Sequence, residues 1–301
     1  MSTTSYDCGN DEQRAAGLAH AQRAIASKQL VVLPTDTVYG VAADAFSPQA
    51  VATLLAAKGR GRSMPPPVLI PRLQTMDGLA AEVPEEARKL AEAFWPGGLT
   101  LICHAQPSLS WDLGDTLGTV ALRMPDHKLA LDLLTITGPL AVSSANRTGA
   151  PAAQSAAAAR EQLGESVEVY LEDAPRDNGI ENGTPNGNDK DEAEGHRDGA
   201  VPEDAVVPGS AATDAAVTED DGAAPADAVV LEDAAATDDA EVPDDAGVLE
   251  DAVATGDAGA PALPSTIVDA TGGVLRVVRL GAISLERLRS VAPSVLGPVE
   301  A

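Results

Sequence analysis

An acidic stretch of about 80 residues interrupts this chain and divides its sequence into two unlike parts. Residues 176–258 hold 24 Asp and Glu side chains against 3 Lys and Arg, a net charge of −21 out of −26 for all 301 residues. The remaining sequence is nearly balanced, at −5. That remainder of roughly 200 residues is long enough to bury one good hydrophobic core. We therefore expect one folded domain, residues 11–175 plus 260–301, interrupted by an insertion at 176–259.

The insertion has the composition of low-complexity sequence. It has few large apolar residues and abundant Ala, Asp, Gly and Pro, and the tetrapeptide Leu-Glu-Asp-Ala of residues 171–174 recurs at 231–234 and 249–252. Such a segment cannot bury enough apolar surface to offset the entropy of ordering, so we expect it to be disordered. Two interpretations stay open: a surface insertion without a catalytic role, or a polyanion mimic that docks a basic partner.

Cysteine content and the N-terminus bear on the compartment. Cys8 and Cys103 are too few for a disulfide framework or a metal knuckle, and the four histidines have no spacing suited to metal binding. The N-terminus lacks a basic start followed by an apolar stretch, and no run approaches 18 continuous apolar residues. We therefore predict a cytoplasmic protein with no resident metal and no membrane segment.

Helix and strand patterns alternate along the predicted domain. A helix over 47–59 is the clearest, because Ser47 is a good N-cap, Pro48 suits the first helical position and Gly59 ends the pattern. Other helices are predicted over 11–29, 83–98, 127–138, 153–164 and 284–291, and strands over 30–34, 66–70, 99–105, 118–125, 139–146, 166–173 and twice within 265–281. This alternation predicts an α/β domain with a twisted, mixed sheet. Because aromatic residues make up only 2%, its core must consist of Ala, Val and Leu.

Polar and cationic side chains gather where these strands and helices end. Thr35 and Tyr39 follow a buried strand, the position where α/β sheets usually hold ligands, although turn residues that bond their own backbone are the alternative. Lys58 and Arg60 lie two apart, so in an extended segment both would project to one side and suit a multi-oxygen anion. The alternative is a solvated basic turn at the end of a helix. The prolines at 65–67 would hold this segment in place.

Further donors follow the later strands. They are Arg123, Ser143, Ser144, Asn146, Ser265, Thr266 and Arg279. No Walker loop, Rossmann glycine fingerprint, HExxH or GxSxG motif occurs, and no obvious general base or nucleophile stands out. A site of cations and hydroxyls without an activated nucleophile suits phosphoryl or nucleotidyl transfer, in which positioning and charge stabilisation do most of the catalysis.

Seven sequence blocks, in this order, resemble the YrdC-type family of threonylcarbamoyl-AMP synthases. The blocks are LVVLPTDTVYGVAADA, AAKGRGRSMPPPVLI, FWPGGLTLI, VALRMPDH, VSSANRTGAPA, STIVDATGG and VLRVVRLGAIS. The resemblance covers essentially the whole predicted domain. It implies a single YrdC-like α/β domain with a deep cationic cavity. It also implies a nucleotidyltransferase that forms L-threonylcarbamoyladenylate and diphosphate, for threonylcarbamoyl-adenosine modification of tRNA beside the anticodon.

The resemblance also implies substrates and residue roles. Lys58 and Arg60 match a Lys-x-Arg pair that would be catalytic and would hold the threonine carboxylate, the carbamate and the phosphates. Threonine binding is implied for Thr35, Tyr39, Ser265 and Thr266, and nucleotide binding for Arg123, Ser144, Asn146 and Arg279. The substrates would be L-threonine, bicarbonate and ATP, with Mg²⁺ bound mainly by phosphate oxygens and water. A separate tRNA-modifying machinery would then use the product.

The chain departs from the family pattern in one loop. Gly61 and Met64 stand where many members have a proline and a basic or polar residue, and Arg62 is a candidate for the missing charge. Two other functions stay open: an RNA-binding module, and a paralogue that acts on another substrate. We do not expect tight tRNA binding, because the predicted domain is not net basic and stacking aromatics are scarce.

Overall fold

The structure, a computed structural model, describes residues 3–173 and 263–298. The insertion predicted at 176–259 lies outside these described residues. The strands are β1 (Thr4–Asp7), β2 (Val31–Leu33), β3 (Gly40–Asp44), β4 (Val68–Leu69), β5 (Ala80–Ala81), β6 (Leu99–Ala105), β7 (Thr119–Arg123), β8 (Leu140–Ser144), β9 (Val169–Glu172), β10 (Thr266–Asp269) and β11 (Arg276–Arg279). The helices are α1 (Asp11–Ala26), α2 (Pro48–Lys58), α3 (Thr75–Leu79), α4 (Glu85–Phe94), α5 (Lys128–Thr137), α6 (Ala156–Leu163), the 3₁₀ turn η1 (Gly164–Ser166) and α7 (Leu285–Val291).

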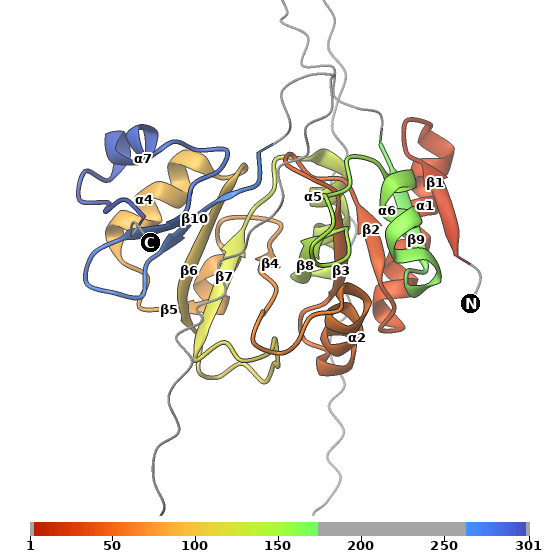
Figure 1. The fold of residues 1–301 in the computed structure, drawn as a ribbon, viewed down its shortest axis with the longest axis horizontal. Helices are drawn as coiled ribbons and strands as arrows, with labels where there is room; N and C mark the ends of the chain where they lie inside the picture. Colours follow the sequence, from red (N-terminus) through yellow and green to blue (C-terminus); the bar gives the residue numbers. More distant parts are fainter. Residues whose placement is uncertain (1–2, 174–262, 299–301) are drawn as a thin grey trace, which may run out of the picture. The chain divides into compact units, whose positions relative to one another are not determined.

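The strands form one mixed sheet, shown in Figure 1. Within the described ranges its order is β1-β9-β2-β3-β8-β4-β7-β6-β10-β11, with β5 beside β6. Four neighbouring pairs are parallel, namely β1 with β9, β9 with β2, β4 with β7, and β6 with β10. The other pairs are antiparallel. The α/β class and the mixed sheet predicted from the alternating pattern are confirmed.

Strand β2 illustrates how the sheet is covered on both faces. Val31 and Leu33 pack in one apolar cluster with side chains of α1 and α5, whereas Val32 packs in another with side chains of α2 and α6. Successive residues of a strand point to opposite faces, so a strand between two helical layers must be apolar throughout. All three residues of β2 are fully buried accordingly.

At the other end of the sheet, α4 and α7 lie side by side, as Figure 1 shows. Their apolar residues join those of β6, β7 and β10 in a third cluster. The predicted Ala, Val and Leu core is confirmed, with a few larger side chains such as Trp95 and Tyr170 added to it. No helix in the described ranges is long and apolar enough to cross a membrane.

Helix α2 begins and ends where its capping residues predict. The Ser47 hydroxyl accepts a hydrogen bond from the Ala50 N–H, Pro48 is the first helical residue, and Gly59 ends the helix in the left-handed region with φ of 66°. Only glycine adopts that backbone conformation without a steric penalty from Cβ. Lys58 is therefore the last residue of the helix.

Several short elements differ from the sequence prediction. Strands β1, β3 and β5 and helix α3 were not predicted, and β1 pairs in parallel with β9. The sheet therefore begins before residue 11, the predicted start of the domain. Strand β1 lies at the edge of the sheet and is only half-buried, so it does not need a run of apolar residues. Its sequence, Thr-Ser-Tyr-Asp, therefore carries no apolar pattern by which a strand could be predicted.

Candidate active site

A cavity of about 460 Å³ opens among the strand ends, a volume typical of sites for small molecules. Two strands share its wall, with Thr100 and Ile102 from β6 and Thr119, Val120, Ala121 and Arg123 from β7. The charged side chains among its described lining residues are Arg60, Arg123 and Arg279, and no carboxylate is among them. Hydroxyl groups come from Thr35, Thr37, Tyr39, Thr100, Thr116, Thr119, Ser143, Ser144 and Ser265. A cavity of this kind favours an anionic ligand with several oxygen atoms.

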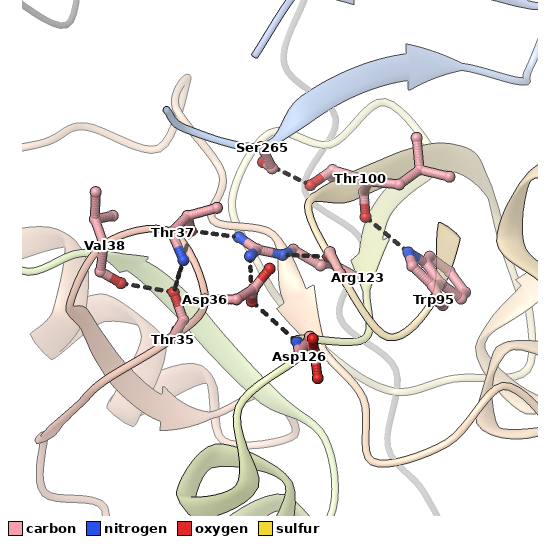
Figure 2. A network of polar contacts seen from close by, with 11 residues as sticks. Thr35, Asp36, Thr37, Val38, Trp95, Thr100, Arg123, Asp126 and Ser265 are labelled. Carbon is pink, nitrogen blue, oxygen red and sulfur yellow. Dashed lines mark hydrogen bonds and ion pairs between the residues drawn. The ribbon is translucent and has the colours of Figure 1, made fainter. Parts of the chain in front are cut away.

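The loop after β2 places Thr35 in the cavity wall. The Thr35 Oγ1 donates a hydrogen bond of 2.7 Å to the Val38 carbonyl and accepts one of 3.2 Å from the Thr37 N–H. Figure 2 shows these bonds closing the loop on itself. Thr35 therefore fits both interpretations considered from sequence. It bonds the backbone of its own loop, as a turn residue does, and it also lines the cavity, where it could contact a ligand.

Arg123 fixes this loop to β7 (Figure 2). Its guanidinium donates to Asp36 Oδ1 at 2.6 Å, to Thr37 Oγ1 at 2.9 Å and to the Gly97 carbonyl at 3.0 Å, and Asp36 Oδ1 also accepts from the Asp126 N–H at 3.0 Å. Burial lowers the pKa of Arg123, and the neighbouring carboxylate opposes that change. The pair is almost fully buried, so Arg123 brings a rigidly held charge to the cavity wall.

Lys58 differs from the expectation that it projects beside Arg60. It ends α2, is 1% exposed and does not line the cavity. Its ammonium donates to the Ser144 carbonyl and hydroxyl at 2.5 and 3.2 Å, and to the Asn146 carbonyl and Oδ1 at 2.6 and 3.1 Å. Ser144 lines the cavity, whereas the side chain of Asn146 is buried in the turn. Lys58 and Asn146 therefore hold in place the turn that carries Ser144.

Arg60 lies beyond the helix end and does reach the cavity. Its Nη1 donates to the Ser143 hydroxyl at 3.1 Å and its Nε to the Thr148 hydroxyl at 3.2 Å. The Thr148 hydroxyl in turn donates to the Lys58 carbonyl at 2.9 Å. Arg60 is partly exposed, so its charge is accessible to a ligand that enters the cavity.

Ser265, just before β10, and Arg279, at the end of β11, both line the cavity. The Thr100 hydroxyl donates to the Ser265 hydroxyl at 2.9 Å, and Arg279 Nη2 donates to the Ser265 carbonyl at 3.0 Å. Figure 2 shows Ser265 and Thr100 facing each other across the two segments. Residues from the two separate stretches of the described chain thus share one wall.

Thr266 is not among the lining residues of the cavity, unlike its neighbour Ser265. Its hydroxyl is fully buried on the other side of β10. It donates to the Ile283 carbonyl at 2.7 Å and accepts from the Gly281 and Ile283 N–H groups, both at 2.9 Å. These three hydrogen bonds direct the Thr266 hydroxyl away from the wall that Ser265 lines. Thr266 holds the turn after β11 instead.

Tyr39 lines the cavity and ties it to the end of β9. Its hydroxyl donates to Glu172 Oε1 at 2.7 Å and accepts from the Asp173 N–H at 3.2 Å. Burial raises the pKa of the Tyr39 hydroxyl far above its ordinary value, so this group remains a neutral hydrogen-bond donor at physiological pH.

Arg62 does not supply charge to the cavity, contrary to the suggestion from sequence. Its guanidinium forms a two-pronged ion pair with Asp112, at 2.9 and 2.8 Å, and a further contact with Asp115 at 3.3 Å. The bond to Asp112 raises the pKa of Arg62 and lowers that of the carboxyl. The positive charge of Arg62 is thus directed to a neighbouring loop.

Other cavity residues were not singled out as site residues from sequence. Thr37 and Thr100 are two of these, and each makes a hydrogen bond to another residue of the wall. Thr37 lies inside a motif that the sequence analysis noted, close to Thr35, whereas Ser143 was noted there as a donor without an assigned role. Thr100 could have been found because it is a polar residue within the otherwise apolar run of residues 99–103 in β6, and such a residue needs a buried partner or a ligand. No group of three His, Cys, Asp or Glu side chains suited to a metal ion occurs in the described part of the chain.

Comparison with curated proteins places the chain among known relatives. A Mycobacterium tuberculosis protein, provisionally named threonylcarbamoyl-AMP synthase, is 54% identical over 173 residues, which is 58% of this chain and 80% of that protein. A Mycobacterium leprae protein of the same provisional name is 55% identical over 56% of this chain and 77% of its own length. The threonylcarbamoyl-AMP synthase of Bacillus subtilis is 37% identical over 57% of this chain and 49% of that protein.

Solved structures share the fold. Pyrococcus abyssi Sua5 complexed with L-threonine matches with a TM-score of 0.64 at 23% identity, over 99% of this chain and 62% of that one. Escherichia coli YciO matches with a TM-score of 0.59 at 13% identity, over 95% of this chain and all of that one. The Sua5, YciO and YrdC family model, described as "Telomere recombination", matches residues 23–183. With more than half of its length matched by that model, this chain belongs to the Sua5/YciO/YrdC family.

Proposed function

We propose that this chain is an L-threonylcarbamoyladenylate synthase, a nucleotidyltransferase that joins L-threonine, bicarbonate and ATP and releases diphosphate. The observation that carries the proposal is the cavity, in which three guanidiniums and a set of hydroxyls meet, with no carboxylate among the lining residues that the structure describes. The names of the mycobacterial and Bacillus relatives support the same reaction. The P. abyssi Sua5 complex supports L-threonine as the amino acid to test first.

The proposed reaction brings anions together. The threonine amine and bicarbonate condense to a carbamate with loss of water, and a carbamate oxygen then attacks the α-phosphorus of ATP and displaces diphosphate. Two anions repel each other in a cavity of low dielectric unless fixed positive charge offsets the repulsion. Arg60, Arg123 and Arg279 would supply that charge at the cavity wall, and the cavity would hold the reactants in line.

Hydroxyl and positioning groups have separate roles in this proposal. Thr35, Tyr39 and Ser265 would bind threonine, and Ser144 and Arg279 would bind the nucleotide. Lys58, Asn146 and Thr266 would act through the turns that they hold, because each is buried and bonded to the protein. Mg²⁺ would enter with ATP, held by phosphate oxygens and water, as suits a wall rich in hydroxyls.

The extent of the domain and its partners form part of the proposal. We place the catalytic domain in residues 11–175 and 260–301, extended at its start by β1, with the acidic insertion as a separate segment. The adenylate would pass to a tRNA-modifying machinery in the cytoplasm. The chain itself would not bind tRNA tightly, because its charge balance outside the insertion is slightly negative.

Diphosphate release from ATP tests the function directly. The purified chain is incubated with ATP, Mg²⁺ and bicarbonate, with L-threonine, with L-serine or with no amino acid, and the adenylate is identified by mass. We expect release that depends on threonine, with the mass of threonylcarbamoyladenylate. A folded chain that releases no diphosphate with either amino acid contradicts the proposal and favours the RNA-binding module or the paralogue.

A further inference from the structure

Arg60 sits in a segment whose backbone has unusual freedom. Gly59 and Gly61 flank it, and glycine loses more conformational entropy on ordering than any other residue. Yet Arg60 must present its guanidinium at a fixed place in the cavity wall if it is to bind a ligand. The contacts around residues 60–62 show what restrains this segment.

The segment is held from two opposite sides. On one side, Arg60 contacts the hydroxyls of Ser143 and Thr148. On the other, Arg62 forms its two-pronged ion pair with Asp112 and its contact with Asp115. We call the contacts of Arg62 with residues 112–115 the clasp.

The backbone takes part in the clasp as well. The Arg62 carbonyl accepts a hydrogen bond from the Asp115 N–H at 2.8 Å, and the Gly114 N–H donates to Asp112 Oδ1 at 3.1 Å. Gly114 has a φ of 109°, and a Cβ there would lie 2.6 Å from the Arg62 carbonyl oxygen. The two loops thus approach so closely that only glycine fits between them.

The loop on the far side of the clasp also lines the cavity. Leu113 and Thr116 belong to the cavity wall, and Trp111 stacks on Phe46 at 5.6 Å between ring centroids, just before α2. The clasp therefore connects two pieces of wall, residues 60–67 and residues 113–116. Its ion pair is exposed, with 58% and 41% of the Arg62 and Asp112 side chains accessible, so the core does not depend on it.

We propose that Arg62 is a positioning residue for the reaction proposed above, which fixes Arg60 and the facing loop through its ion pair with Asp112. This inference rests on the proposed function for its kinetic readout only. Loss of the clasp would let both loops move, so substrates would bind less tightly while the bonded groups in the rest of the cavity stay in place. The effect would fall on KM more than on kcat.

The kinetic test compares Arg62→Ala with a charge-swapped double variant, Arg62→Asp with Asp112→Arg. We expect KM for ATP to rise about fivefold in R62A, as for an exposed ion pair with good geometry, with kcat within about twofold. The swapped pair should reverse at least half of that rise in KM. Arg88→Ala is the matched control. Arg88 forms an exposed ion pair of 2.8 Å with Asp77, and neither residue lines the cavity.

Fluorescence of Trp111 tests the same inference without activity. The chain has two tryptophans, and Trp95 is buried in the core, so acrylamide quenching reports mainly on Trp111. Quenching should increase in R62A, stay unchanged in R88A and go back towards the wild-type level in the swapped variant. Salt at about 1 M should increase quenching in wild type but not in R62A, because it screens exposed charges.

The possible outcomes separate the two proposals. A wild-type chain that releases no diphosphate contradicts the proposed function, and the quenching series still decides whether the clasp holds the loop. If R62A matches R88A in both KM and quenching, the clasp has no positioning role. If R62A changes quenching but not KM in an active enzyme, Arg62 holds the loop without affecting the reaction, which also overturns the inference.

Discussion

Two sides of the cavity hold an arginine in place by different means. Arg123 is buried, and its partners Asp36, Thr37 and Gly97 enclose it. Arg60 is partly exposed, lies between two glycines and depends on contacts across loops. A buried charge must have its partners, because leaving it unpaired costs several kcal/mol. Substitutions around Arg123 should therefore lower both activity and the free energy of unfolding, whereas substitution of Arg60 should lower activity alone.

The largest effect is expected on the buried side. Asp36→Ala removes the partner of a buried guanidinium and should lower the free energy of unfolding by roughly 3–5 kcal/mol. Urea unfolding followed by circular dichroism measures the loss. Asp36→Asn keeps an oxygen that can accept from Arg123 and from the Asp126 N–H. The free energy of unfolding should therefore fall less in this variant than in Asp36→Ala. An unchanged unfolding midpoint in Asp36→Ala would show that the pair does not hold this wall together.

A second prediction separates the neighbours Lys58 and Arg60. Lys58→Met removes hydrogen bonds to four oxygens around the Ser144 turn, so it should lower the free energy of unfolding by roughly 2–4 kcal/mol and also abolish adenylate formation. Arg60→Ala should reduce turnover by about 100-fold or more and change stability by less than about 0.5 kcal/mol. Parallel unfolding curves and diphosphate assays measure both. Equal stability losses in the two variants would remove the distinction between the buried and the accessible cation.

The two thiols provide a smaller test, away from both sides of the cavity. Burial raises the pKa of Cys8 and Cys103 to about 11, from an ordinary value of 9.0. At pH 8 only about one thiol in a thousand is then ionised, so iodoacetamide should label them far more slowly in the native chain than in urea. Because the native pKa is the higher one, the stability that these thiols contribute is present below pH 9 and is lost as the pH rises towards 11.

Labelling is followed by intact mass, and stability by unfolding at pH 8, 9 and 10. A chain with both cysteines changed to alanine should keep its diphosphate release within about twofold, because neither thiol lines the cavity. Complete native labelling at the rate seen in urea would contradict the buried, neutral state of the thiols.

The smallest effect is expected from deleting residues 176–258. If both sides of the cavity are complete without the acidic insertion, kcat and KM should stay within about twofold of the full chain. Steady-state assays with each substrate varied in turn measure this. A large fall in either constant would show that the insertion takes part in the reaction, and a fall seen only with a basic partner present would support the docking interpretation.

Sequence predicted best what local chemistry decides. The ends of α2 follow from Ser47, Pro48 and Gly59, because capping depends on neighbouring residues only. Strand β1 was missed because an edge strand that is half exposed needs no apolar pattern. Strand β3, Gly-Val-Ala-Ala-Asp, was missed because its small residues fit a helix or a strand equally well.

Within the site, sequence predicted the motifs better than the direction of each side chain. Thr35, Arg60, Arg123 and Arg279 all line the cavity, as their place at the ends of strands or helices suggested. Lys58 turns inward because it is still part of α2, as its last residue, and Thr266 turns away because its hydroxyl is bonded to the turn after β11. Arg62 pairs with Asp112, 50 positions along the chain, and local sequence offers no signal for such a partner.

The pairing of β10 with β6 has a consequence for how the protein is made. Thr100 and Ser265, bonded across these segments, lie 165 positions apart in the chain. During synthesis at roughly 5–20 residues per second, β6 would lack this neighbour for many seconds, and its residues 99–102 would stay unpaired on that side. Contacts between such distant residues also slow folding, because the connecting chain must first be brought together. The cavity is complete only once Arg279 has been synthesised, so a nascent chain cannot form it before the ribosome has passed this residue.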